Sequence, residues 1–172
     1  MPVQEGDQFR VQAEVQPAAY LYLFWIDTEG QAVPVFPWQA GKWGTRPAAE
    51  RPRSQLSLPE ERATGGYSIK GKATGMETLL LLARPEPLAL DEAAVRRLFA
   101  GLPPQRPVQD RRSAVWFENG AVVRHDARRQ RSHLQVTEIN DLVFRLQGLL
   151  RDRLQPQAAF TAAVSFARPG TP

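Results

Sequence analysis

The sequence contains no cysteine among its 172 residues. This absence excludes disulfide scaffolds, zinc ribbons, iron–sulfur sites and cysteine nucleophiles, and it favours a reducing, cytoplasmic location. Apolar runs of the roughly 20 residues that a membrane helix needs are missing as well. The amino end, MPVQEGDQFR, lacks the basic start and apolar core of a signal peptide. We therefore expect a cytoplasmic protein with no membrane segment.

Lysine is scarce, so arginine supplies nearly all of the positive charge. The chain has 22 lysine and arginine residues against 18 aspartate and glutamate residues, a formal charge of +4. After residue 103 the basic residues outnumber the acidic ones by 11 to 6, and arginines gather in the stretch 106–131. This stretch could contact phosphates, so binding of an anionic polymer such as nucleic acid is one alternative function. We do not favour it, because no recognition helix or ribonucleoprotein aromatic signature accompanies the charge.

Alternation of apolar and polar residues predicts β-strands in the first half of the chain. Residues 9–15 alternate as a strand with one wet face does, and residues 20–27 are apolar on both faces, as in a central strand covered twice. Asp27 to Gly30 has the residues of a type I turn, from which residues 31–36 can return antiparallel. Pro34 indicates that this returning strand is an edge or is bulged. Shorter strands are predicted over residues 55–58, 67–69 and 77–84.

Two helices are predicted beyond the strand-rich region. Asp91 is a suitable N-cap for a helix over residues 91–100, which Gly101 ends. Apolar residues at helical spacing predict a second helix over residues 138–154. Four leucines should form its buried face: Leu142, Leu146, Leu149 and Leu150.

The order of these elements indicates the fold class. A strand-rich region over residues 9–84 is followed by a hairpin over 114–123, closed by the turn-favouring pair Asn119-Gly120, and by a last strand over 160–166. Hairpins dominate, and strands and helices do not alternate regularly. We therefore predict a single domain over residues 1–172 of the mainly β or α+β class, an antiparallel β-sheet or sandwich with two packed helices.

Two motifs resemble ligand loops but lack essential residues. The segment from Gly66 follows a phosphate-binding loop until Ala73, which replaces the hydroxyl that would hold magnesium. Thr74-Gly75 would also break the helix that such a loop must open. We interpret the segment as a glycine-rich turn between strands. The start of a calcium loop at Asp27 lacks its remaining ligands, so we predict no metal site and no cofactor.

An enzymatic function is a further alternative, and the enzyme class to consider is a hydrolase. The histidines are His125 and His133, in or next to the arginine-rich stretch. No Gly-x-Ser-x-Gly elbow precedes them, and the adjacency of Asp126 to His125 establishes no triad geometry. We expect solvated histidines on a polar loop, no catalytic residue and no enzymatic activity, and we keep a hydrolase using His125 or His133 as an alternative.

A long loop over residues 37–54 contains the best candidate binding residues, Trp38, Lys42, Trp43 and Arg46. Two tryptophans in so polar a loop need a reason. They could fold back as lids on the sheet, since a buried aromatic side chain anchors a loop well. Alternatively, one stays partly exposed beside a cationic residue and forms a recognition surface, since Trp and Arg are favoured interface anchors. The second possibility makes these four residues the candidate site for a partner or ligand.

Several short motifs occur in the order found in a bacterial family. They are Glu5-Gly6-Asp7, Tyr20-Leu21-Tyr22-Leu23, Phe36-Pro37-Trp38, Gly75-Met76-Glu77-Thr78 and Trp116-Phe117-Glu118-Asn119-Gly120. The chain thereby resembles the four-three-eight-four family of domains of unknown function. The resemblance implies an accessory module, similar to those attached to serine/threonine kinases, caspase-like peptidases and other signalling proteins, and it supplies no catalytic residues. We expect a non-enzymatic accessory or sensor module that binds a partner protein, a fused signalling domain or a small ligand in a bacterial signalling system.

Overall fold

A computed structural model describes most of the chain. The described residues are 3, 5–38, 43–44, 46, 50–59, 65–70, 75–105, 113–118, 121–126 and 145–168. For residues 113–118, 121–126 and 167–168 only the backbone is described. All structural statements below refer to this part of the chain.

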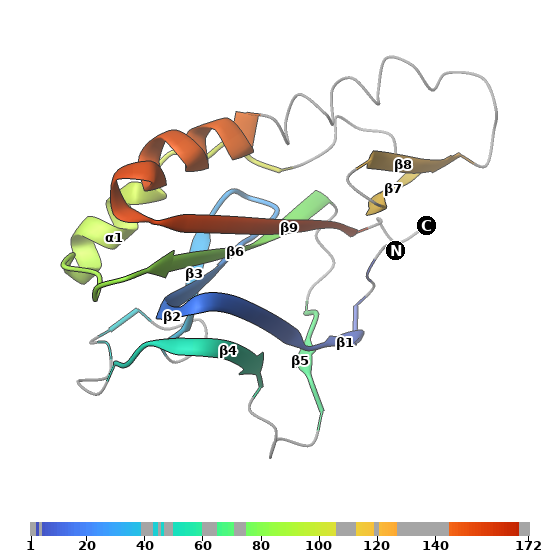
Figure 1. The fold of residues 1–172 in the computed structure, drawn as a ribbon. Coiled ribbons are helices and arrows are strands. Elements are labelled where there is room, and N and C mark those ends of the chain that lie inside the picture. The colour runs from blue at the N-terminus through green and yellow to red at the C-terminus, as the bar shows by residue number, and fades with distance from the viewer. Residues whose placement is uncertain are drawn as a thin grey trace.

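A five-stranded antiparallel sheet forms the centre of the structure (Figure 1). Four strands follow in the order β3 (Ala32–Phe36), β2 (Val11–Ile26), β6 (Gly75–Arg84) and β9 (Phe160–Arg168). The fifth, β4 (Arg53–Leu58), pairs with the first half of β2. The predicted antiparallel sheet is confirmed.

β2 is one strand of 16 residues, although the sequence predicts two strands here, over 9–15 and 20–27. This division is wrong, because Gln16 to Ala19 continue in the extended conformation and contain no turn. The strand changes its partner at this point, from β4, which pairs with Glu14, to β6, which pairs with Tyr20. The predicted burial is confirmed on both sides of the change. Residues 11–16 alternate between half-buried and exposed, and most of residues 20–26 are buried on both faces.

The Asp27–Gly30 turn that joins β2 to β3 is confirmed. Gly30 donates its N–H to the carbonyl of Asp27 at 3.0 Å. The Asp27 carboxylate oxygen Oδ1 accepts from the N–H groups of Glu29 and Gln31, at 2.9 and 2.8 Å. β3 is an edge strand, and its register against β2 shifts opposite Pro34, as a proline in a strand predicts.

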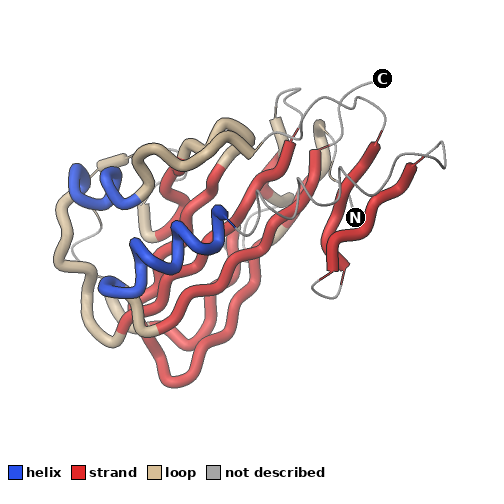
Figure 2. The backbone as a smooth tube through the Cα atoms, turned by 90° about the horizontal axis from the view of Figure 1, so that it is seen from above, coloured by secondary structure: helices blue, strands red, loops and turns tan. Residues whose placement is uncertain are grey.

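Two helices cover one face of the sheet (Figure 2). α1 (Glu92–Leu98) begins at the predicted N-cap, where Asp91 Oδ1 accepts from the N–H of Ala94 at 2.7 Å. The second helix is described over 145–154, and the rest of the predicted range, 138–144, lies outside the described residues. Leu146 and Leu150 are buried as predicted, and Leu149 is half-buried; Leu142 is not among the described residues.

The two faces of the sheet bury separate apolar clusters, because successive side chains of a strand point to opposite faces. The helix-side core contains Tyr22, Phe24, Ile26, Trp38, Leu80, Leu82, Leu88, Val95, Phe99, Leu102, Leu146, Leu150 and Leu154. The β4-side core contains Leu21, Leu23, Val35, Leu56, Leu58, Leu81 and Ala83.

Two smaller β-structures accompany the central sheet. β1 (Gln8–Phe9) pairs antiparallel with β5 (Tyr67–Ser68), which lies within the strand predicted over 67–69. Residues 71–74 of the predicted glycine-rich turn lie outside the described part. β7 (Ser113–Glu118) and β8 (Ala121–Asp126) form the predicted hairpin, whose turn residues 119 and 120 lie outside the described part. β9 confirms the last predicted strand and extends it to Arg168. β7 lies next to β9. A short 3-10 helix, η1 (Gln155–Gln157), leads into β9.

The segment after α1 approaches the β2–β3 turn closely at Gly30. We expect Gly30→Ala to lower the free energy of unfolding more than Gly101→Ala does. Both glycines have positive φ, +76° and +66°, so both substitutions carry a backbone cost of about 1–2 kcal/mol. Of these two positions, only Gly30 has carbonyl oxygens close to the new Cβ, those of Pro103 at 2.6 Å and Leu102 at 2.7 Å, whereas a Cβ at Gly101 would meet nothing within 4 Å. Urea unfolding of the two variants measures the difference, and equal losses would contradict this close approach.

Candidate functional site

Trp38, the first of the predicted binding residues, belongs to the helix-side core. Its side chain is buried, and its ring lies 5.3 Å from that of Phe24 and 5.9 Å from that of Tyr22. The indole Nε1–H donates to the carbonyl of Gly44 at 3.1 Å. The buried indole therefore anchors the loop on the sheet, and its N–H group keeps a hydrogen-bond partner.

Trp43 lies against the same cluster and is half-buried. Its ring packs edge-on against Trp38, with ring centres 5.8 Å apart. The guanidinium carbon of Arg96, on α1, stands 5.3 Å from the centre of the Trp43 ring, within the range of a cation–π contact. Trp43 thus joins the loop to both the sheet and the helix.

Arg46 is the centre of a polar network at the edge of this core. Its guanidinium donates to the carbonyls of Leu88 and Leu90 and forms an ion pair with Glu50, with Nε and Oε1 at 3.3 Å. The Tyr22 hydroxyl donates to Glu50 Oε2 at 2.7 Å and accepts from the N–H of Leu88 at 2.8 Å. Arg46 donates to the same hydroxyl at 3.4 Å. This network ties the long loop to β2 and to the segment before α1.

The structure therefore brings Trp38, Trp43 and Arg46 together, and all three make contacts that hold the loop on the helix-side core. Lys42 lies outside the described residues. Binding of a partner or ligand by these four residues stays a prediction. The contacts of the three described residues explain why two tryptophans occur in a polar loop.

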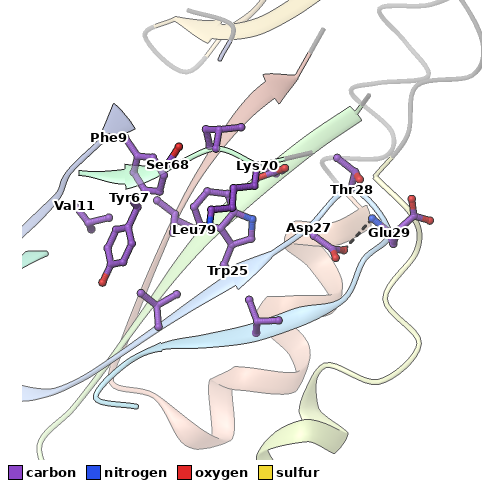
Figure 3. Close-up of a pocket in the computed structure, with 14 residues that line it drawn as sticks. Phe9, Val11, Trp25, Asp27, Thr28, Glu29, Tyr67, Ser68, Lys70 and Leu79 are labelled. Carbon is purple, nitrogen blue, oxygen red and sulfur yellow. Dashed lines mark hydrogen bonds between the residues drawn. The ribbon is translucent and has the colours of Figure 1, made fainter. Parts of the chain in front are cut away.

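A cavity that the sequence did not reveal lies on the opposite face of the sheet, between the sheet and the β1–β5 pair (Figure 3). We call it the β1–β5 cavity. Its volume is about 590 Å³. Its lining residues are Phe9, Val11, Trp25, Asp27, Thr28, Glu29, Val33, Val35, Tyr67, Ser68, Ile69, Lys70, Glu77 and Leu79.

The floor of the β1–β5 cavity is a row of side chains across the sheet. Trp25 pairs with Val33 of β3 on one side and with Leu79 of β6 on the other, so the three side chains share one face. All three are half-buried, because β4 pairs only with the first half of β2 and leaves this end of the face open. The wall is aromatic: the Phe9 ring lies 5.1 Å from that of Trp25 and 5.7 Å from that of Tyr67.

The two ends of the cavity differ in polarity. Figure 3 shows Phe9, Val11 and Tyr67 at one end, Asp27 and Glu29 at the other, and Trp25 between them. Tyr67 is half-buried at the apolar end, and this burial raises the pKa of its phenol above the usual value.

A second cavity, of about 440 Å³, lies where β2 changes partner. Its lining is mostly small apolar residues such as Ala18, Ala19 and Ala83. Its arginine, Arg84, already donates to the backbone carbonyl and to the side-chain oxygen of Gln157. The cavity offers few polar groups for recognition, and we do not take it as the candidate site.

The residues considered for catalysis and for nucleic-acid binding are described only in part. His125 belongs to β8 by its backbone, and His133 lies outside the described residues, as does most of the stretch 106–131. Among the described side chains, no three His, Cys, Asp or Glu residues come together as a possible metal site. No helix in the described part of the chain is long and apolar enough to cross a membrane.

Comparison with protein families identifies the first half of the chain. The model of the family described as Domain of unknown function (DUF4384) matches residues 2–87. The chain belongs to this family. No curated protein and no solved structure matches the chain. The DUF4384 segment includes β1 to β6 and all the described residues that line the β1–β5 cavity.

Sequence reasoning missed this site because each of its aromatic lining residues is individually typical of a buried strand. Phe9, Trp25 and Tyr67 come from three strands, and no motif joins them. The alternation of residues 9–15 placed Phe9 on an apolar face, and the strand assignment placed Trp25 likewise. The half-buried state of these rings, which marks the cavity, depends on where β4 ends, and no local pattern shows that.

We expect Tyr22 to ionise at unusually high pH. Burial, with a smaller contribution from the hydrogen bond to Glu50, raises the pKa of Tyr22 from 10.0 to about 12. A pKa raised on folding gives stability that is complete below pH 10 and is lost as the pH rises from 10 to about 12. In an ultraviolet titration, Tyr22→Phe should lack the phenol that ionises near pH 12. Its free energy of unfolding should also fall less steeply between pH 10 and 12 than that of the unchanged protein. A Tyr22 that titrates near pH 10 would contradict the network described above.

Proposed function

We propose that the chain is a non-enzymatic accessory or sensor module of a bacterial signalling system, and that it binds its ligand in the β1–β5 cavity. The observation that carries the proposal is the coincidence of this cavity with the DUF4384 segment: the lining residues that the structure describes all lie within residues 2–87. The resemblance to modules attached to kinases and caspase-like peptidases supports the signalling role, and the lack of cysteine fits a cytoplasmic location.

The dimensions and the lining of the cavity support binding of a small group. Ligand sites typically enclose about 300–1,000 Å³ and combine apolar walls with a few polar groups. The β1–β5 cavity, at about 590 Å³, has aromatic walls from Phe9, Trp25 and Tyr67 and polar groups from the β2–β3 turn. Either a small molecule or a side chain of a bound protein could enter a space of this kind.

The composition of the lining favours binding over catalysis. The described lining residues include no histidine, the side chain that most often serves as a general acid or base. The Asp27 carboxylate already accepts two backbone hydrogen bonds, which suits a fixed recognition group. A hydrolase using His125 or His133 would place its chemistry away from this cavity.

Indole should bind to the cavity, because its apolar ring matches the aromatic walls. Nuclear magnetic resonance titration should shift the backbone signals of Phe9, Trp25 and Tyr67. Ser68→Trp, which places a large ring at the edge of the cavity, should abolish these shifts. Ser54→Trp, at an exposed position of β4, is the matched control and should bind indole as the unchanged protein does. Absence of any shift at the lining residues would overturn the assignment of the site.

The non-enzymatic role predicts that the protein turns over neither p-nitrophenyl acetate, p-nitrophenyl phosphate nor casein. Release of nitrophenol and of acid-soluble peptides measures these activities. A steady rate that disappears in His125→Ala or His133→Ala, with the fold retained, would establish a hydrolase instead.

A further inference from the structure

The charged residues of the β1–β5 cavity are mainly acidic. Among the described residues that line it, three carry carboxylates, Asp27, Glu29 and Glu77, and one, Lys70, carries an ammonium group. Three negative charges and one positive charge leave an excess of two negative charges, whereas the whole chain is positive by four. Glu29, Lys70 and Glu77 also interact with other groups. The summed charge of the described lining residues is negative even where these side chains pair with one another.

The negative charge has a defined position at one end. Asp27 and Glu29 both belong to the turn that joins β2 to β3, and Figure 3 shows them away from Phe9 and Tyr67. The two hydrogen bonds to its Oδ1 hold the Asp27 carboxylate in one orientation. A carboxylate that is already oriented loses little freedom when a ligand binds.

Trp25 stands between the acidic end and the apolar end (Figure 3). The face of an indole ring attracts cations, and Trp is the strongest of the aromatic side chains in this respect. Phe9, which packs against Trp25, and Tyr67, which packs against Phe9, offer apolar ring surface to the uncharged part of a ligand. The cavity thus combines a surface for a cationic head with a surface for an apolar body.

We propose that the β1–β5 cavity recognises an amphipathic cation, an aromatic or aliphatic body that carries one ammonium or guanidinium group. This inference rests on the proposed function and names the ligand class of the same site. The body packs against the rings of Phe9 and Tyr67, which contact each other, and the cationic head lies beside Trp25 and Asp27. A free amine and an arginine or lysine next to an aromatic residue in a partner protein share this chemistry.

Three capped dipeptides test the charge of the ligand: N-acetyl-Phe-Arg-amide, N-acetyl-Phe-Gln-amide and N-acetyl-Phe-Glu-amide. The indole N–H signal of Trp25, assigned with Trp25→Phe, follows their binding. The arginine peptide should bind about tenfold more tightly than the glutamine peptide, and the glutamate peptide more weakly still. The advantage of the arginine peptide should fall with rising salt, because salt screens partly exposed charges.

A variant pair locates the charge effect. Glu29→Gln should weaken binding of the arginine peptide and leave binding of the glutamine peptide unchanged. Glu86→Gln removes the same charge at an exposed position outside the cavity and is the matched control. If Glu29→Gln does not fold, the salt series on the unchanged protein decides the same question.

Phenethylamine distinguishes the two sources of the ligand. Salt-sensitive binding of phenethylamine without binding of the arginine peptide indicates a free amine, and binding of the arginine peptide in preference to the glutamine peptide indicates a protein segment; either result supports the inference. Equal affinity for all three peptides would overturn the amphipathic cation and leave the proposed function standing, provided that indole binds. If neither indole nor any of these compounds shifts Trp25, both proposals are wrong.

Discussion

The structure depends on the burial of both faces of β2, the strand that lies between β3 and β6 in the sheet. Its second half sends Tyr22, Phe24 and Ile26 into the helix-side core and Leu21 and Leu23 into the β4-side core. A shift of one residue in register would exchange the two sets. It would also remove the Tyr22 hydroxyl from Glu50 and from the N–H of Leu88, and a buried polar group without a partner costs about 1–3 kcal/mol. Packing and hydrogen bonding therefore specify the same register.

The same strand creates the candidate site. β2 pairs with β4 along its first half and with β6 along its second half. The β4 side chains Leu56 and Leu58 pack with Leu21 and Leu23 of β2, whereas Trp25 on the same face stays half-buried. The uncovered part would expose a contiguous apolar surface, which a folded protein seldom leaves open. The short β1–β5 pair lies over it without filling it, and a cavity with an aromatic wall results.

Local chemistry made much of this fold predictable. The Asp27 turn, the Asp91 N-cap and the alternation in β2 each depend on residues within a few positions of one another, and each occurs as predicted. The joining of two predicted strands into one, and the cavity itself, depend on which distant segments pair. Periodicity shows that Trp25 is apolar and extended; it does not show that β4 ends before reaching it. The sequence likewise identified Trp38 as a loop residue needing an explanation, and long-range packing supplied one.

The segment that follows the DUF4384 match completes the site without lining it. Gln105 donates its backbone N–H to the carbonyl of Thr28 at 2.8 Å, and its own carbonyl accepts from Met76 at 2.7 Å. It therefore joins the β2–β3 turn, which carries Asp27, to the start of β6. Because the glutamine is buried, this link lies away from water and is hard to break locally. The position of the β2–β3 turn, and with it the acidic end of the cavity, thus depends on hydrogen bonds from beyond residue 87.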